Sequence, residues 1–421
     1  MSTHSRAAIE SIYRSAVAQV DAGAAVERSV ARSDGDIVVT GMRRAIPAQG
    51  IYAIAFGKAA LPMARTLEHQ LGEVLRSSIA VAKNDDGGPR PRARVLFGSH
   101  PTPDARSLAA GAAVWSFAEQ LPRGALVFCL ISGGGSSLME LPRDETSLEQ
   151  ISRLTAQLLD AGASISELNA VRSRLSKLKG GGLLRALDGC HVCNLVVSDV
   201  LGDPPTIIAS GPTMPAAEGE PAEDVLQRFR IAFELPPPIP SAVPSQVEWH
   251  VIANVSGAID AAAQQAATLG LQPFVLTRSL AGEAREVAGV VTAIALDTAR
   301  GKTTLPSEAC IIAGGETVVT VRGNGNGGRN TEGALAAALL LQGEPDVTIG
   351  FLATDGDDAR TGLAGGIVDG RTIGPGDEAS ARAALANNDS ATILERLGAA
   401  FRTGPTATNV NDLVIAIVGK G

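Results

Sequence analysis

Aromatic residues are scarce in this 421-residue sequence, in which Phe, Tyr and Trp together make up only 3%. Its four cysteines are too few to stabilise a chain of this size through disulfides, which favours a reduced, cytoplasmic setting. No apolar run approaches the ~18 residues that a transmembrane helix needs, so no membrane span is predicted. Residues 1–10 also lack the apolar core of a signal peptide.

An excess of basic residues is absent as well. Lys and Arg number 36 against 44 Asp and Glu, which gives a formal net charge of −8. A general nucleic-acid binder needs a basic face and usually aromatic stacking, so that class of protein is excluded. A small anionic ligand stays open, because a few local Arg and Lys side chains suffice to bind one.

Aliphatic residues and glycine are abundant instead. Hydrophobic residues make up 45% of the sequence, charged residues 19%, and there are 47 glycines. The length suggests two or three domains at about 150 residues each, and two is the simpler expectation. This composition is typical of an α/β protein with aliphatic cores and glycine-rich loops.

Short apolar runs alternate with longer Ala- and Leu-rich stretches, the pattern of βαβ units. Strands are predicted at 51–56, 126–131, 195–200, 251–253, 273–276, 309–313, 317–321, 347–353 and 413–418. Helices are predicted at 59–71, 148–161, 168–187, 258–269, 283–299, 331–341, 380–386 and 393–400.

Five prolines within residues 235–244 exclude a helix or a central strand there and indicate an interdomain linker. We therefore predict a Rossmann-like domain at 1–235, a linker at 236–244 and a second α/β domain at 245–421. Both are expected to be doubly wound, with the active site in a cleft between them. The last strand has the alternative of packing on the first domain.

A glycine- and serine-rich segment, SGGGSS, directly follows the predicted strand 126–131. It comprises Ser132, Gly133, Gly134, Gly135, Ser136 and Ser137. Its backbone N–H groups and hydroxyls form a donor array suited to phosphate or carboxylate, which we favour over a plain flexible turn. Lys58 follows the strand 51–56 in the same way and is placed to meet an anion, although most lysines are only solvated.

A row of polar side chains lies on the predicted helix 168–187. Asn169, Arg172, Ser176 and Lys179 are spaced to share one helix face, which suits either an anionic substrate or a solvated surface. The pair Cys190 and Cys193 is a lone C-x-x-C, and neither zinc nor redox chemistry is expected from it.

Acidic side chains follow two predicted strands. Asp199 and Asp203 stand after 195–200, where their carboxylates could hold Mg²⁺. Asp355 begins a second acidic segment after 347–353; the competing interpretation as an EF-hand loop fails, because Arg360 and Gly366 stand where Gly and Glu are required.

The segment GNGNGG at 323–328 matches the G-x-G-x-x-G fingerprint of dinucleotide enzymes through Gly323, Gly325 and Gly328. It lies in the middle of a domain rather than after the first strand of a Rossmann unit. Arg329 and Asn330 at the following helix start suit phosphate better than tight helix–strand packing.

These motifs, in this order, resemble the glycerate 2-kinase family whose C-terminal part is called the MOFRL domain. The matching segments are AFGKA at 55–59, SHPTPD at 99–104, ISGGGSSL at 131–138, LNAVRSRLSKLKGG at 168–181, SDVLGD at 198–203, IASGPT at 208–213, GGET at 314–317, GNGGRN at 325–330, ATDGDD at 353–358 and TGPTATNVNDL at 403–413. The resemblance implies phosphorylation of the C2 hydroxyl of D-glycerate with ATP and Mg²⁺.

The resemblance also implies roles for individual residues. Lys58 and Arg329 correspond to the catalytic pair proposed for the family, one in each domain. Asp199 and Asp355 would hold metal and orient the hydroxyl, in either assignment, with Asp203 as a further metal ligand. The remaining expected contacts are Ser132–Ser137, Gly327 and Gly328 for the nucleotide phosphates, and Asn169, Arg172, Lys179 and Asn411 for the substrate.

The chain departs from the family pattern at Asn324, Asn326, Ala359, Gly362 and Ala407. These departures bear on substrate preference more than on reaction type. The alternatives that stay open are an NAD(P)H-dependent hydroxypyruvate reductase, a kinase of a related small hydroxyacid, and a non-catalytic phosphometabolite-binding protein.

Overall fold

The computed structural model describes residues 3–143, 146–215, 220–238, 246–306 and 308–419, and the chain forms two compact units. The N-terminal unit is Ala22–Ile252, and the C-terminal unit is Met1–Asp21 together with Ala253–Gly421. The first 21 residues thus join the C-terminal unit, which differs from the predicted division at 235. Most of the predicted linker lies outside the described residues.

The helices of the N-terminal unit are α2 (Ala22–Ser29), α3 (Ala60–Leu71), α4 (Ala105–Glu119), α5 (Gly135–Leu138), α6 (Leu148–Asp160), α7 (Ile165–Leu175), α8 (Gly182–Ala186) and α9 (Ala222–Arg228), with 3-10 turns η1 (Gly72–Val74) and η2 (Ile208–Ser210). Its strands are β1 (Val30–Ser33), β2 (Asp36–Val39), β3 (Met42–Ala45), β4 (Ile51–Phe56), β5 (Leu75–Ala82), β6 (Arg94–Phe97), β7 (Leu126–Ile131), β8 (His191–Val197) and β9 (Val247–Ala253).

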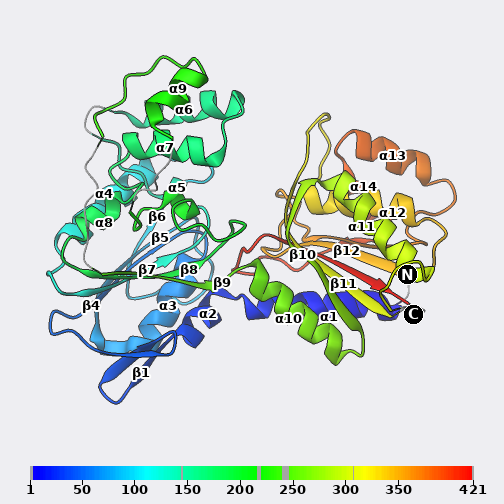
Figure 1. Ribbon diagram of the computed structural model, residues 1–421, viewed down its shortest axis with the longest axis horizontal. Helices are drawn as coiled ribbons and strands as arrows, with labels where there is room; N and C mark the ends of the chain where they lie inside the picture. The colour runs from blue at the N-terminus through cyan, green and yellow to red at the C-terminus, as the bar shows by residue number, and fades with distance from the viewer. Residues whose placement is uncertain (1–2, 144–145, 216–219, 239–245, 307, 420–421) are drawn as a thin grey trace. The chain divides into compact units, whose positions relative to one another are not determined.

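The main sheet of the N-terminal unit has the order β6-β5-β4-β7-β8-β9 and is parallel from β6 to β8. Alternate residues of its strands, such as Ile54 and Phe56, pack with Val114 of α4 and Leu183 of α8. Helix α3 covers the opposite face (Figure 1). Because both faces are covered, the central strands are apolar throughout, as expected of a doubly wound sheet.

A cluster of three helices, α6, α7 and α9, adds a small second core to this unit (Figure 1). Helices α6 and α7 begin at capping boxes formed by Ser147 with Gln150 and by Ser164 with Glu167, which satisfy N–H groups of the first turn. Leu154 and Leu168 are among the apolar side chains that join the helices. The cluster stands beside the strand ends where the predicted site residues lie.

The predicted helix 168–187 is wrong. Helix α7 ends at Leu175, and Ser176 is extended with φ −113° and ψ 141°. The chain leaves the helix because the N–H of Lys177 donates to the carbonyl of Leu141 at 2.7 Å, and Gly180 has a positive φ of 55°. The four polar residues therefore do not share one helix face.

The helices of the C-terminal unit are α1 (Thr3–Gln19), α10 (Val255–Thr268), α11 (Ala284–Ala299), α12 (Arg329–Leu341), α13 (Glu378–Ala386) and α14 (Ser390–Arg396). Its strands are β10 (Gln272–Glu283), β11 (Ala309–Val318), β12 (Val347–Ala353), β13 (Gly365–Asp369), β14 (Ala400–Phe401) and β15 (Asp412–Val418).

The sheet of the C-terminal unit has the order β10-β11-β15-β12-β13-β14 and is mixed. Only β10 and β11 are parallel; β15 lies antiparallel between β11 and β12. The alternative that the last strand packs on the first domain is therefore wrong. The predicted strands 309–313 and 317–321 are one strand, β11, which continues through Gly315 because β10 lies against it: a Cβ there would be 2.2 Å from the Leu280 carbonyl oxygen.

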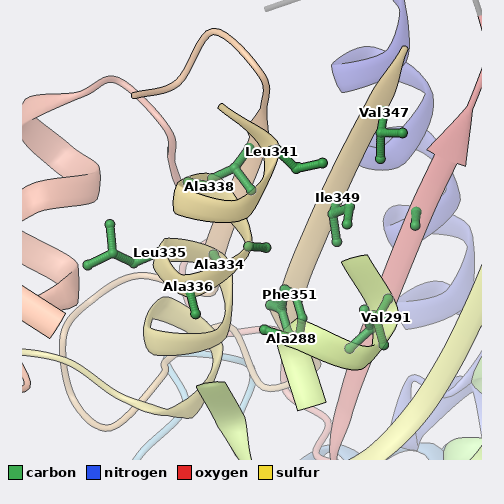
Figure 2. Close-up of a cluster of buried hydrophobic side chains, with 14 of the residues drawn as sticks. Ala288, Val291, Ala334, Leu335, Ala336, Ala338, Leu341, Val347, Ile349 and Phe351 are labelled. Atoms are coloured by element: carbon green, nitrogen blue, oxygen red, sulfur yellow. The ribbon is translucent and has the colours of Figure 1, made fainter. Parts of the chain in front are cut away.

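Helices α11 and α12 pack on one face of this sheet and α1 and α10 on the other (Figure 1). In Figure 2, Ala334 and Leu341 of α12 lie on the side of the helix toward Ile349 and Phe351 of β12, and Leu335 points away from that strand. Gly333 permits this approach, since a Cβ there would lie 2.7 Å from the Phe351 ring. No helix of the described residues has the length and hydrophobicity to cross a membrane.

Helix α1 is fixed to the C-terminal sheet by a buried tyrosine. The Tyr13 hydroxyl donates to the carbonyl of Ala353 at 2.8 Å, and its ring meets Phe401 edge-on at 5.2 Å. Burial and hydrogen bonding of this kind favour a single docked position. The contact explains why the first residues of the chain belong with its last third.

Candidate active site

Hydrogen bonds join the turns that follow strands β4 and β7 at the SGGGSS segment. Strands β4 and β7 are parallel neighbours, so the turns that follow them meet at one edge of the sheet. Ser132 Oγ accepts from the N–H of Ala59 at 3.0 Å, and the N–H of Lys58 donates to the Gly133 carbonyl at 2.9 Å. A Cβ on Gly57, whose φ is 123°, would lie 2.2 Å from Ser132 Oγ. Only glycine permits this approach.

Three candidate reactive side chains surround the glycines of the segment. A Cβ on Gly134 would lie 3.4 Å from Lys58 Cγ and 3.0 Å from the ring of His100. A Cβ on Gly133 would lie 1.8 Å from Asp199 Oδ2. The structure therefore brings Lys58 and Asp199 to the SGGGSS loop, as predicted, and adds His100. The SHPTPD motif was the signal that could have indicated His100.

A hydrogen-bonded relay joins this loop to helix α7. The Ser136 and Ser210 hydroxyls are 2.9 Å apart, Arg172 donates to Ser136 Oγ at 2.7 Å, and Ser210 donates to Asn169 Oδ1 at 2.9 Å. Ser210 and its neighbour Ala209 have positive φ values of 62° and 51°. Left-handed backbone at two successive non-glycine residues costs free energy and is typical of functional sites.

Arg172 is a buried cation at this relay. Burial lowers the pKa of its guanidinium although Glu140 opposes the shift, and its Nε has no hydrogen-bond partner among the described residues. The hydrogen bond to Ser136 pairs it with a neutral hydroxyl, not with a carboxylate. An anionic ligand would compensate this buried charge.

Lys179 lies in a different environment from Asn169 and Arg172. Its ammonium forms an ion pair with Glu140, and both side chains are almost fully buried. Ser176 Oγ donates to the same carboxylate at 2.5 Å, and burial lowers the pKa of Lys179 to about 8. This closed pair anchors the segment after α7, so we do not include Lys179 in the proposed substrate contacts.

Asp203 follows Asp199 in the turn after β8. Its N–H donates to the carbonyl of Val200 at 3.1 Å, and its φ is 52°. Carboxylate oxygens are the ligands that Mg²⁺ prefers, and Asp199 presses its carboxylate against the loop. Asp199 therefore offers the kind of ligand that a magnesium ion takes.

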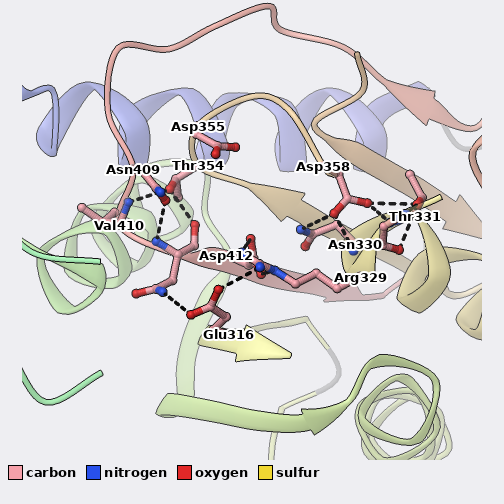
Figure 3. A network of polar contacts seen from close by, with 12 residues as sticks. Glu316, Arg329, Asn330, Thr331, Thr354, Asp355, Asp358, Asn409, Val410 and Asp412 are labelled. Carbon is pink, nitrogen blue, oxygen red and sulfur yellow. Dashed lines mark hydrogen bonds and ion pairs between the residues drawn. The ribbon is translucent and has the colours of Figure 1, made fainter. Parts of the chain in front are cut away.

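In the C-terminal unit, two carboxylates hold the guanidinium of Arg329 (Figure 3). Nε donates to Asp412 Oδ2 at 2.5 Å, Nη2 to Asp412 Oδ1 at 3.2 Å, and Nη1 to Glu316 Oε1 at 2.8 Å. Burial raises the pKa of Asp412 to about 6 although Arg329 opposes the shift. Sequence reasoning missed Glu316 and Asp412, which stand in the GGET and NVNDL motifs.

Asn411 belongs to the same network. Its Nδ2 donates to Glu316 Oε2 at 3.2 Å, and its carbonyl accepts from the N–H and hydroxyl of Thr354 at 3.1 and 2.6 Å. Asp355 is the residue after Thr354, in the turn that follows strand β12 (Figure 3). The structure thus gathers Arg329 and Asn411 in one network, with Asp355 beside it.

The glycines of GNGNGG pack against other segments of the C-terminal unit, not against open space. A Cβ on Gly325 would lie 2.4 Å from Asp389 Cβ, and one on Gly327 would lie 2.4 Å from Ser390 Oγ. On Gly328 it would lie 2.4 Å from Asp358, whose carboxylate accepts from the N–H of Thr331 at 2.7 Å and caps α12. These contacts give the fingerprint a packing role, which removes the support for a dinucleotide site.

Comparison with known proteins identifies the family of this chain. Residues 8–243 match the family described as a domain of unknown function, DUF4147, and residues 309–412 match the MOFRL family. The D-glycerate 2-kinase of Thermotoga maritima is 40% identical over 379 residues, covering 87% of this chain and 90% of that protein. This chain belongs to the glycerate kinase family.

The solved structures support the same assignment. A crystal structure of a glycerate kinase from Thermotoga maritima superposes with a TM-score of 0.86 at 37% identity, covering 97% of each chain. A protein of Agrobacterium vitis, 35% identical and covering 87% of this chain and 98% of its own length, bears the name hydroxypyruvate reductase only provisionally. Membership of the glycerate kinase family implies ATP as phosphoryl donor.

Proposed function

We propose that this glycerate kinase family member transfers the γ-phosphoryl group of ATP to the C2 hydroxyl of D-glycerate, giving 2-phosphoglycerate and ADP. The observation that carries the proposal is the packing of Lys58 and Asp199 on the SGGGSS loop. Phosphoryl transfer needs an anion cradle, a cation and a metal-binding carboxylate at one place. The names of the relatives identify glycerate as the acceptor.

The N-terminal unit supplies the donor side of the reaction. Backbone N–H groups of Gly133–Ser136 bind phosphate oxygens, and the Lys58 ammonium neutralises charge on the transferring group. Asp199, with Asp203 as a second ligand, would hold Mg²⁺, which would supply positive charge to offset that of the phosphates. Arg172 binds an anionic group of substrate, since its own charge is buried beside a neutral hydroxyl.

Arg329 supplies a second, oriented cation. A guanidinium has five N–H donors, and the two carboxylates use three of them. The two that remain lie on Nη1 and Nη2 and suit bidentate contact with a phosphoryl group. We propose that Lys58 and Arg329 act on the same phosphoryl group, with Asn411 on the substrate and Asp355 orienting the C2 hydroxyl.

An acceptor screen tests this function. Purified protein with ATP and Mg²⁺ is supplied with D-glycerate, L-glycerate, tartronate or hydroxypyruvate, and ADP formation is followed. We expect turnover with D-glycerate and a product that 31P NMR identifies as 2-phosphoglycerate. NADH oxidation with hydroxypyruvate and no ADP formation would contradict the proposal.

A further inference from the structure

The N-terminal unit contains a pocket that the proposed chemistry does not use. It has a volume of about 650 Å³ and lies between α7, α9 and the segment from Thr206 to Gly211. Cavities of this size are typical of small-molecule sites. Glycerate, a three-carbon acid, would leave most of it empty, so the pocket fits a larger ligand.

The pocket is connected to the SGGGSS loop by a chain of side-chain hydrogen bonds. Asn169 lines the pocket, and its Oδ1 accepts from Ser210, whose hydroxyl is 2.9 Å from that of Ser136 in the loop. Gly211, next to Ser210, also lines the pocket. A ligand in the pocket with a chain of a few phosphates could therefore reach the loop.

One arginine that lines the pocket has no carboxylate partner among the described residues. Its three acidic side chains are paired with arginines: Arg174 with Glu223, and Arg228 with Glu167 and Glu220. Arg185 also lines the pocket and forms no ion pair with any acid of the described residues. Burial lowers the pKa of Arg185, and the nearby Arg143 lowers it further. An unpaired, partly buried cation favours an anionic ligand.

Arg185 stands beside the turn that joins the pocket to the loop. Its Nη2 is 3.4 Å from the place where a Cβ on Gly182 would be. The preceding glycines hold the Ser210 segment: the N–H of Gly180 donates to the Ser210 carbonyl at 3.0 Å. Arg185 thus stands at the turn 180–182, which also holds the Ser210 segment.

The rest of the pocket offers aliphatic surface. Ala170, Ile207, Pro215 and Ala222 line it, and among the described lining residues none is aromatic. Such a wall accepts a flat, largely apolar body without stacking it on a ring. The pocket therefore combines an apolar chamber, a cation at one side, and a hydrogen-bonded connection to a phosphate cradle.

We propose that this pocket binds the nucleoside of the phosphoryl donor and that Arg185 binds its phosphate chain, which continues to the SGGGSS loop. The inference rests on the proposed function for the identity of the donor. Ala170 faces the nucleoside from α7, so a large side chain at this position displaces it. Arg185 recognises the phosphates whichever base is attached.

Two variants and two ligands test the assignment by calorimetric titration, with no turnover required. Ala170→Phe should raise the Kd of ADP at least tenfold and leave that of inorganic tripolyphosphate within twofold. Arg185→Ala should raise both. Ala156→Phe, on an exposed face of α6, and Arg106→Ala, at an exposed position of α4, are matched controls that should bind both ligands like the wild type.

The outcomes separate this inference from the proposed function. An unchanged ADP Kd in folded Ala170→Phe and Arg185→Ala proteins, with melting temperatures near wild type, would overturn the pocket assignment even if glycerate is phosphorylated. A higher KM for glycerate with unchanged ADP binding would also overturn it and assign the pocket to the acceptor. ADP binding that depends on both residues would support it even if glycerate is not the acceptor.

Discussion

The two glycine-rich loops of this protein read alike in sequence and differ in what surrounds them. In SGGGSS, the space beside Gly133 and Gly134 is taken by Asp199, Lys58 and His100. In GNGNGG, the corresponding space is taken by the 387–390 segment and Asp358. Glycine brings reactive side chains to the backbone in the first loop and packs two backbone segments together in the second.

The difference teaches that glycine spacing alone does not identify a phosphate site. Close approach of a backbone is needed both for a ligand and for tight packing, and both select glycine. What distinguishes the first loop is its place at the end of parallel strand β7, next to the end of β4. What distinguishes the second is Arg329 just after it, held by carboxylates.

The largest effects are expected at the cation beside each loop. Lys58→Ala and Arg329→Ala should each lower kcat by about 10²–10³ and leave the Kd of ATP within a few-fold, because both act on charge in the transition state. Arg329→Lys should rescue little, since an ammonium lacks the planar fork. Steady-state kinetics and nucleotide titration measure both quantities.

The double variant of Lys58→Ala and Arg329→Ala tests whether both cations act on the same phosphoryl group. If Lys58 and Arg329 act on the same phosphoryl group, their combined loss should be smaller than the product of the single losses. Fully multiplicative losses, or near-normal turnover in a folded single variant, would contradict a shared role.

Matched glycine substitutions sharpen the comparison directly. Gly133→Ala would drive a Cβ into Asp199 and should lower kcat about 10²-fold by displacing it. Gly325→Ala would meet Asp389 and should instead lower stability by about 1–3 kcal/mol, seen as a lower melting temperature. The opposite pattern, with activity lost only in Gly325→Ala, would make GNGNGG the ligand loop.

A smaller, pH-dependent effect is expected at Asp412. Its folded pKa of about 6 lies above that of an unfolded Asp, so kcat should fall as the pH drops through 6 and the clamp on Arg329 loses an anionic acceptor. The same shift means that its contribution to folding stability decreases as the pH rises from about 4 to 6.

Asp412→Asn should lower kcat about tenfold at pH 8 and remove the acid limb near pH 6. A limb unchanged in this variant would assign it to another group.

The smallest effect is expected at the C-x-x-C pair, away from either loop. Burial raises the pKa of Cys190, and raises that of Cys193 to about 12. Glu248 and His250 lie within 4.8 Å of Cys193, but Arg44 donates to both Glu248 oxygens at 2.7 and 2.8 Å. Cys190→Ser should retain activity, and elemental analysis should find no stoichiometric zinc; one zinc per chain would contradict this.

Much of the fold could be predicted because strand cores are continuous apolar runs. The predictions for 51–56, 126–131 and 347–353 match β4, β7 and β12 to the residue. The helix predicted through 187 failed because the burial of Ser176 and Lys179 against Glu140 is a long-range effect that local periodicity does not contain. Helices α1, α2, α4 and α9 and strands β1, β2, β3, β5, β6 and β13 were among the elements missed.

The candidate site was predicted best for residues that directly follow a predicted strand. Lys58 and Asp199 follow parallel strands, and topology brings strand ends together. Family membership and glycerate kinase function were predicted from ordered motifs and are confirmed by the relatives. Glu316 and Asp412 were missed because their importance comes from ion pairs with Arg329, which join distant residues of the sequence.

The position of β15 has a consequence for synthesis of the protein. This strand, residues 412–418, fills the gap between β11 and β12, so the C-terminal sheet lacks an inner strand until the ribosome has made residues 412–418. Helix α1 is made long before the sheet on which Tyr13 packs. The N-terminal unit can complete its sheet earlier, so the nascent chain carries one folded unit while open strand edges of the other need protection from aggregation.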